Sequence, residues 1–287
     1  MLEVTLNVYS GRPNPQWMLA DEQETSFLSQ LDQITQITLT KPPGVLPRLG
    51  YRGFLVNRSP RSPQGPLSLL IQDKIVDFGQ NQPNRIADNR DLELWLLSTA
   101  RVEIPAKVRS FVTNELNQSP IDAGAASGVG ASGSNCPQCM AVDAPAYNPA
   151  LWNTPAVEPY NNCYNYANDQ ITNTFAQPGR AHGVFPVNID CDDYQNAATA
   201  DGLALSAGFA NPLAAGQGWY VALAVWPGVD FHWYRQDDNG CWSHKPGQTP
   251  VTNLDNSGTP ITDPANCNRG DYEFCCYMIT DRNVVIS

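Results

Sequence analysis

The stretch DFHWYRQDDNGCWSHKPG, residues 230–247, predicts a β-hairpin, and the length of its loop decides whether its two histidines share a face of the sheet. DDNG is a strong turn signal between two aromatic-rich strands. A two-residue turn would place His232 and His244 on opposite faces of the sheet. A three-residue loop that ends at Gly240 instead pairs Tyr234 with His244 and makes the histidines diagonal neighbours on one face. The sequence allows both loops, and Gly240 favours the longer one because glycine accepts the left-handed conformation required there.

Around this hairpin, hydrophobic periodicity and turn residues predict an α+β protein. The first 117 residues form a small α+β domain of unknown role, with strands at 2–9, 51–58 and 67–78 and helices at 20–34, 91–100 and 105–116. A linker rich in Gly, Ala, Ser and Pro, which contains CPQC, covers 118–149. Residues 150–287 form the second domain, with helices at 163–175 and 195–208 and strands at 218–226, 229–236, 241–245 and 272–281.

Charge and composition exclude several classes of function. The 287-residue chain has a net charge of −11, and all of it lies in residues 121–287, which carry 5 basic and 16 acidic side chains. Such a surface repels phosphate backbones, so we expect no nucleic-acid partner. No apolar run approaches the roughly 18 residues of a membrane span, so we expect no transmembrane segment. The start, MLEVTLNVYS, alternates like a strand, and no signal peptide is visible in it.

Cysteine usage points to an oxidising environment, and therefore to an extracellular location. All eight cysteines lie in an acidic, lysine-poor part of the chain. Seven of them are candidates for disulfides: Cys136, Cys139, Cys191, Cys241, Cys267, Cys275 and Cys276. CPQC has the spacing of half a zinc site or of a redox pair, but no second pair has suitable spacing. Calcium-loop spacing is absent around Asp255. We therefore expect no metal and no cofactor.

Cys163 is the candidate nucleophile. Asn161 and Asn162 are good helix caps, which places Cys163 in the first turn of a helix, where the helix dipole favours a thiolate. His232 is the candidate general base, and His244 would orient its ring. Alternatively, Cys163 is half of a disulfide, and both histidines are surface residues of the hairpin.

This arrangement resembles the papain-like bacterial cell-wall cysteine peptidases and amidases. In that superfamily, a helix that carries the cysteine packs on an antiparallel sheet that carries the histidine, and a third polar residue completes a triad. The resemblance implies catalysis by Cys163, His232 and His244 on a peptide or amide substrate, such as cell-wall or matrix material. Tyr160 or Tyr166 would support the thiol, and Asp263 is an alternative orienting residue. The Asp-His pair of the superfamily is adjacent, whereas Phe231 intervenes here.

A second resemblance is closer in amino-acid sequence. The stretches NNCYNYANDQITNTFAQPGRAHG and HWYRQDDNGCWSHKPG are similar to those of a little-characterised family of bacterial and invertebrate proteins, which includes an insoluble mollusc shell matrix protein. This family implies no established activity. The sequence therefore leaves two main functions open: a cysteine hydrolase with a Cys-His-His triad, or a disulfide-stabilised extracellular structural, matrix or surface-binding protein. A secreted effector that uses the same thiol chemistry is a third alternative. The oligomeric state is not predicted.

Overall fold

The computed structural model describes residues 1–36, 48–58, 62–63, 65–79, 83–118 and 136–287. The chain divides into two compact units: unit 1 comprises Met1–Val8, Asn14–Leu46 and Tyr51–Ser127, and unit 2 comprises Tyr9–Pro13, Pro47–Gly50 and Gly128–Ser287. Both combine helices with antiparallel strands, so the α+β class predicted from the sequence is confirmed. Within the described parts of the chain, no helix has the length and apolarity to cross a membrane.

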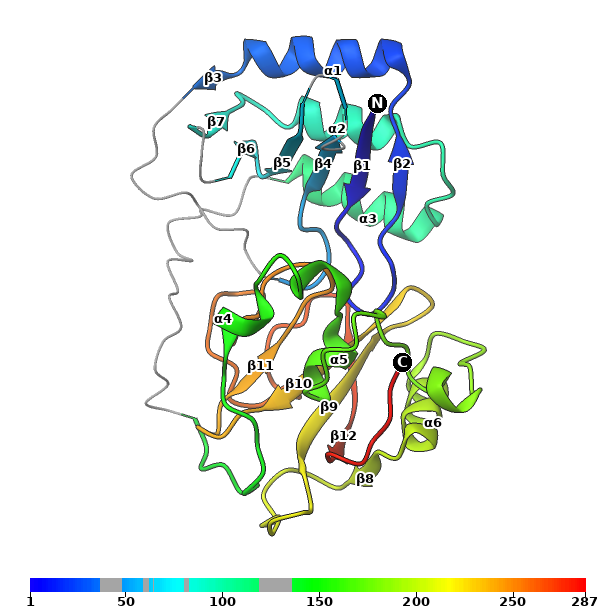
Figure 1. Cartoon of the computed structure of the whole chain (residues 1–287), viewed down its shortest axis with the longest axis vertical. Coiled ribbons are helices and arrows are strands. Elements are labelled where there is room, and N and C mark those ends of the chain that lie inside the picture. The colour runs from blue at the N-terminus through cyan, green and yellow to red at the C-terminus, as the bar shows by residue number, and fades with distance from the viewer. Residues whose placement is uncertain (37–47, 59–61, 64, 80–82, 119–135) are drawn as a thin grey trace. The chain divides into compact units, whose positions relative to one another are not determined.

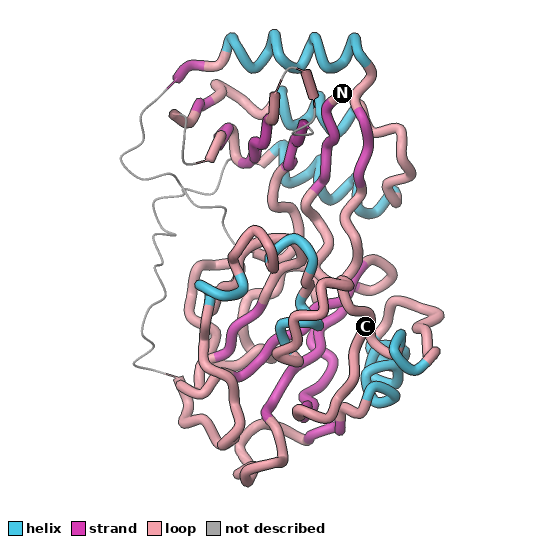
Figure 2. The backbone as a smooth tube through the Cα atoms, in the orientation of Figure 1, coloured by secondary structure: helices cyan, strands magenta, loops and turns pink. Residues whose placement is uncertain are grey.

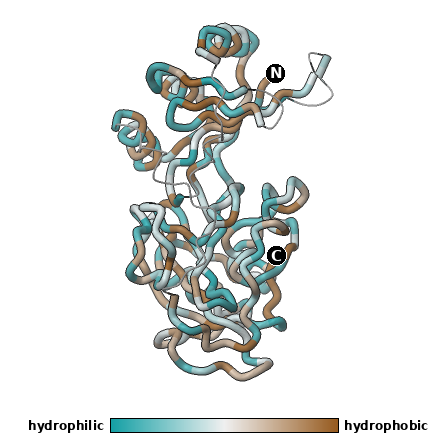
Figure 3. Tube along the Cα trace, turned by 90° about the vertical axis from the view of Figure 1, so that its left-hand side faces the viewer, coloured by the Kyte–Doolittle hydropathy of each residue, from teal (hydrophilic) through white to brown (hydrophobic). Residues whose placement is uncertain are grey.

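Unit 1 is built on a seven-stranded sheet with the order β2-β1-β4-β5-β6-β7-β3. Its elements are β1 (Leu2–Leu6), β2 (Gln16–Met18), α1 (Asp21–Gln33), β3 (Thr35–Gln36), β4 (Phe54–Arg58), β5 (Leu67–Gln72), β6 (Ile75–Asp77), β7 (Arg85–Ile86), α2 (Asp91–Ser98) and α3 (Ala106–Asn117). Hydrophobic and hydrophilic residues alternate along its helices (Figure 3). In α1, Phe27 and Leu31 lie one turn apart and are both buried, as expected of an amphipathic helix.

Unit 2 is built on a five-stranded sheet with the order β11-β10-β9-β12-β8 (Figure 1). Its elements are α4 (Pro149–Trp152), η2 (Glu158–Tyr160), α5 (Cys163–Ala167), η3 (Arg180–His182), α6 (Cys191–Asp201), β8 (Ala204–Ser206), β9 (Trp219–Trp226), β10 (Asp230–Gln236), β11 (Trp242–His244) and β12 (Glu273–Thr280). Every residue of β9 and β10 is buried, and long loops connect the short helices to the sheet (Figure 2). The helix α5 packs on β10.

The helix that carries Cys163 is much shorter than the sequence predicts. A helix was expected over residues 163–175, but α5 ends at Ala167. Asn168 is its C-cap, and Asp169 adopts a φ of 51°, in the left-handed region, so the helical path stops there.

The N-terminal part of the chain contributes to unit 2. The segment Tyr9–Pro13 clusters with unit 2, although the residues on both sides of it, Val8 and Asn14, belong to unit 1. Composition gives no sign of this assignment, because the segment reads as an ordinary Pro- and Asn-rich loop. Its hydrogen bonds define the centre of the candidate site.

Candidate functional site

The hairpin has the three-residue loop that Gly240 favours. Tyr234 pairs with His244 across β10 and β11, and the Asp237 amide donates to the Cys241 carbonyl at 2.9 Å. Gly240 adopts a φ of 82°. The predicted register is therefore confirmed, and it places both histidines on the same face.

Two buried histidines, His232 and His244, lie in the middle of a series of hydrogen bonds, called the histidine chain below. His232 Nε2 lies 2.8 Å from His244 Nδ1, and His244 Nε2 lies 3.0 Å from the Leu254 carbonyl oxygen. His232 Nδ1 lies 2.5 Å from the hydroxyl of Ser10, 222 residues away in the sequence. A carbonyl only accepts, so His244 Nε2 carries a proton. With both rings neutral, His232 then donates to His244, and Ser10 donates to His232.

Cys163 lies at the Ser10 end of the histidine chain. Asn162 caps α5 through the amides of Tyr164 and Asn165, as expected of a helix-capping asparagine. Cys163 is fully buried, and burial raises the pKa of its thiol to about 12, although a hydrogen bond with the Ser10 side chain opposes the rise. The sequence predicted a lowered pKa and a thiolate at Cys163, and the structure gives a raised pKa instead. The reason is that α5 is only one turn long and the sulfur is shielded from water.

Asp230 holds the segment that carries Ser10. Its carboxylate accepts the backbone N–H groups of Ser10 at 2.5 Å, Gly11 at 3.3 Å and Arg12 at 3.1 Å, and the Tyr272 hydroxyl at 2.6 Å. Three successive amides that converge on one carboxylate form an anion-binding nest. Burial raises the pKa of Asp230, while these hydrogen bonds oppose the rise. The Asp230 carboxylate thus accepts all of these hydrogen bonds from residues of unit 2.

The carbonyl of the same segment is held from the other side. The Gly11 oxygen accepts from Asn162 Nδ2 at 2.8 Å and from Gln177 Nε2 at 2.9 Å. A Cβ atom at Gly11 would lie 2.5 Å from the Phe231 ring, so a larger residue would fit only if this ring moved. Phe231 is itself fixed by the ring of Tyr194, 4.4 Å away between centroids.

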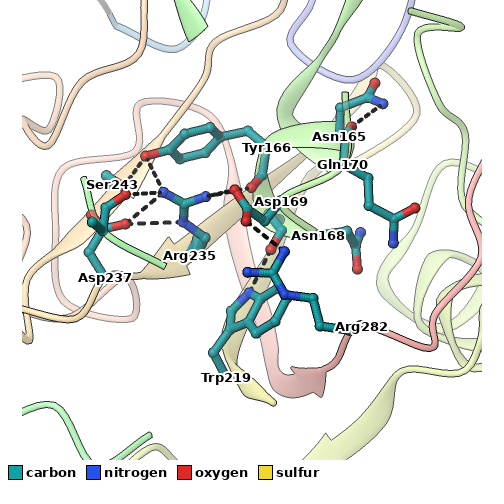
Figure 4. A network of polar contacts seen from close by, with 12 residues as sticks. Asn165, Tyr166, Asn168, Asp169, Gln170, Trp219, Arg235, Asp237, Ser243 and Arg282 are labelled. Carbon is teal, nitrogen blue, oxygen red and sulfur yellow. Dashed lines mark hydrogen bonds and ion pairs between the residues drawn. The ribbon is translucent and has the colours of Figure 1, made fainter. Parts of the chain in front are cut away.

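A second buried network surrounds Arg235 (Figure 4). Its guanidinium donates to Asp237 Oδ1 at 2.9 Å and to Asp169 Oδ1 at 3.1 Å, and it lies 4.0 Å above the centre of the Tyr166 ring. The Tyr166 and Ser243 hydroxyls are 2.6 Å apart. Burial raises the pKa of Asp237 to about 6, while Arg235 opposes the rise. This network fastens α5 to the hairpin.

Two disulfides form in unit 2, between Cys136 and Cys241 and between Cys191 and Cys275. The other four cysteines are free thiols: Cys139, Cys163, Cys267 and Cys276. Three of these, Cys139, Cys267 and Cys276, were candidates for disulfides, and this part of the expectation is corrected. Cys275 lies at an irregularity of β12, where the register with β9 shifts between Phe274 and Cys276, and it is Cys275 that pairs with Cys191.

The remaining predicted site residues lie apart from the histidine chain. Tyr160 is exposed, and Tyr166 faces Arg235. Asp263 accepts from the Tyr277 hydroxyl and from the Ala265 amide, so it organises its own loop, and His244 has the orienting contact with His232. In the described residues, no group of three or more His, Cys, Asp or Glu side chains is placed to hold a metal ion.

Sequence reasoning missed Ser10, Gly11 and Asp230. Asp230 could have been found, because residues two apart on a strand share a face, and Asp230 precedes His232 by two. Nothing in the sequence connects SGR near the N-terminus with a strand more than 200 residues later.

Comparison with known proteins supplies the family. The chain is 46% identical over 136 residues to insoluble matrix shell protein 1 of Ruditapes philippinarum, an alignment that covers 47% of this chain and 88% of that protein. The chain belongs to the family of this shell matrix protein. No family model matches the chain, and no solved structure matches it. The resemblance to a mollusc shell matrix protein is thereby confirmed, whereas the papain-like resemblance has no matching family model.

Proposed function

We propose that this chain is a disulfide-stabilised extracellular protein of a structural matrix, without catalysis. Kinship with a shell matrix protein carries the proposal. The two disulfides are consistent with an extracellular location. The state of Cys163 also supports it, because a fully buried thiol with a pKa raised to about 12 is protonated near neutral pH and is shielded from a substrate.

The acidic surface of unit 2 is the part that would meet the matrix. Exposed carboxylates include Asp192, Asp271 and Glu273, whereas only five basic side chains occur after residue 120. Carboxylate oxygens are ligands for hard divalent cations. A mineral surface that presents such cations, for example calcium carbonate, is therefore the matrix component that we expect this protein to bind.

Co-sedimentation of the full chain with calcium carbonate particles tests this proposal. A variant with Asp192→Asn, Asp271→Asn and Glu273→Gln should bind several-fold less, and added salt should weaken binding by the wild type. Asn196→Ala with Thr262→Ala changes exposed neutral residues and serves as the matched control. Equal binding by the acidic and control variants would exclude the carboxylate surface as the binding element.

A cysteine hydrolase is the second candidate. Successive hydrogen bonds connect Cys163 to Ser10, Ser10 to His232, and His232 to His244. In a catalytic Cys-His pair the thiol would contact the histidine directly, and here Ser10 occupies the position between them. Catalysis would require the Ser10 segment to move and the thiol to reach His232. Incubation of the native chain with iodoacetamide at neutral pH, followed by peptide mass spectrometry, separates the candidates. Labelling of Cys163 faster than an unfolded cysteine would favour the hydrolase, and protection favours the matrix protein.

A further inference from the structure

The segment Tyr9–Pro13 is bound to unit 2 in the manner of a peptide ligand. Its three consecutive amides, from Ser10 to Arg12, donate to the Asp230 carboxylate. Its Gly11 carbonyl accepts from two side-chain amides, and the Ser10 hydroxyl is hydrogen-bonded to His232 Nδ1. The main-chain N–H groups, the main-chain carbonyl and the Ser10 side chain of the segment therefore each bind a different group of unit 2.

The same contacts set a sequence requirement. Any larger residue at position 11 would have to displace the Phe231 ring, since a Cβ atom there would lie 2.5 Å from it. The Ser10 position requires a small hydroxyl side chain that reaches His232 Nδ1. Arg12 donates through Nη1 to the Val229 carbonyl at 2.6 Å. The site therefore fits a Ser-Gly-Arg segment, and Asn162, Asp230 and His232, which contact the segment, are fully buried.

We infer that this is a peptide-recognition site and that it also accepts the Ser-Gly-Arg segment of a second copy of the chain. Exchange of an identical element between copies re-forms the same contacts, so it has a low energetic cost and is governed by protein concentration. Each copy carries one segment and one site. The segment is continuous at both ends with Val8 and Asn14 of unit 1, so a second copy would present it as a loop.

Exchange of this kind can join copies without limit. When a copy receives a segment from one neighbour and gives its own to another, the contact is heterologous, and such contacts build open chains unless the rotation closes a ring. The inference deepens the proposed matrix function, because it names how copies would assemble. The biological role given to the assembly rests on the proposed matrix function. The exchange of the segment does not, since it is measured without any mineral.

A pair of complementary full-length variants tests the inference. Gly11→Val blocks the segment and leaves the site intact, whereas Asp230→Ala disables the site and leaves the segment intact. Each variant alone should be predominantly monomeric, at 31.4 kDa. An equimolar mixture should form a heterodimer of twice that mass, detected by light scattering after size-exclusion chromatography. Gly208→Val, at a glycine with open space around it, and Asp271→Ala are the matched controls and should not associate when mixed.

Cys163 reports on the same event, because this buried thiol is hydrogen-bonded to the Ser10 side chain of the bound segment. Its alkylation should be about tenfold or more faster in Gly11→Val than in the wild type, since forcing a larger side chain into a packed site opens it. Addition of the Asp230→Ala chain should restore protection. A mixture that stays at monomer mass, with Cys163 of the Gly11→Val chain still reactive, would overturn the inference and leave mineral binding as a separate question.

A peptide experiment covers the case in which either variant fails to fold. Acetyl-Tyr-Ser-Gly-Arg-Pro-amide, labelled with a fluorophore, is offered to the wild-type chain in mild denaturant, where the internal segment is released part of the time. We expect saturable binding, which unlabelled peptide reverses and which is lost when the peptide carries Gly11→Val. Equal binding of both peptides, or no binding, would also overturn the inference.

Discussion

Replacement of Asp230 by alanine tests the central contact of unit 2. The carboxylate is fully buried and accepts from Ser10 N, Arg12 N and the Tyr272 hydroxyl at 2.5, 3.1 and 2.6 Å. Hydrogen bonds to charged groups contribute about 1.5–3 kcal/mol each, and a buried donor without an acceptor costs about 1–3 kcal/mol. Burial of the carboxylate offsets part of this gain, as its raised pKa indicates. We therefore expect the free energy of unfolding to fall by about 3–5 kcal/mol.

For a domain of 150–250 residues this loss corresponds to a fall in Tm of roughly 6–20 °C, at about 2–4 °C per kcal/mol. The measurement is thermal and urea unfolding of the full chain, followed by circular dichroism. Asp271→Ala removes an exposed carboxylate and should change stability by less than about 0.5 kcal/mol. If Asp230→Ala unfolds within that margin of the wild type, the Ser10–Arg12 segment is not held as described, and the reasoning fails.

Three further results are expected. Because folding raises the pKa of Cys163 from 9.0 to about 12, its contribution to stability is complete below pH 9 and is lost as the pH rises toward 12. The stability difference between wild type and Cys163→Ala should therefore fall by about 1.4 kcal/mol per pH unit above pH 9, measured by urea unfolding. Gly240→Ala should lower the free energy of unfolding, measured by thermal unfolding, by about 3 kcal/mol or more, because the new Cβ would lie 1.7 Å from a carbonyl oxygen. Gly258 has a φ of 75° but open space around it, so Gly258→Ala should lower the free energy of unfolding by only about 1–2 kcal/mol. Changing Cys136 and Cys241 together to serine, a pair 105 residues apart, should cost about 4–5 kcal/mol by the loop-entropy relation, measured by urea unfolding.

Each of these has a clear contrary result. A pH-independent difference for Cys163→Ala would mean that the thiol titrates normally in the folded chain. Equal losses at Gly240 and Gly258 would show that backbone strain, and not close approach, decides both. Unchanged stability after loss of the Cys136–Cys241 disulfide would mean that the unfolded chain gains no freedom from its removal.

The local elements of the chain were predictable because they follow from neighbouring residues. Strand alternation and turn chemistry placed β9, β10, β11 and β12 within a few residues of their observed bounds. Gly240 favoured the correct hairpin loop, and hence the pairing of Tyr234 with His244. The helix at Cys163 was overextended, since the stop at Asp169 depends on a left-handed conformation that nothing in the local pattern specifies.

The sequence by itself determined the α+β class, because periodicity and turn residues act over a few positions. Through Gly240 it also favoured the hairpin register that places two histidines on one face, although it did not settle the loop length. Only the tertiary structure decided what those histidines contact. Ser10 reaches His232 across 222 residues, and the same fold buries Cys163 and raises its pKa. Burial and long-range hydrogen bonding depend on how distant segments pack. This packing raises the pKa of the thiol for which the sequence predicted a thiolate, and it places Ser10 of the N-terminal part within hydrogen-bonding reach of that thiol.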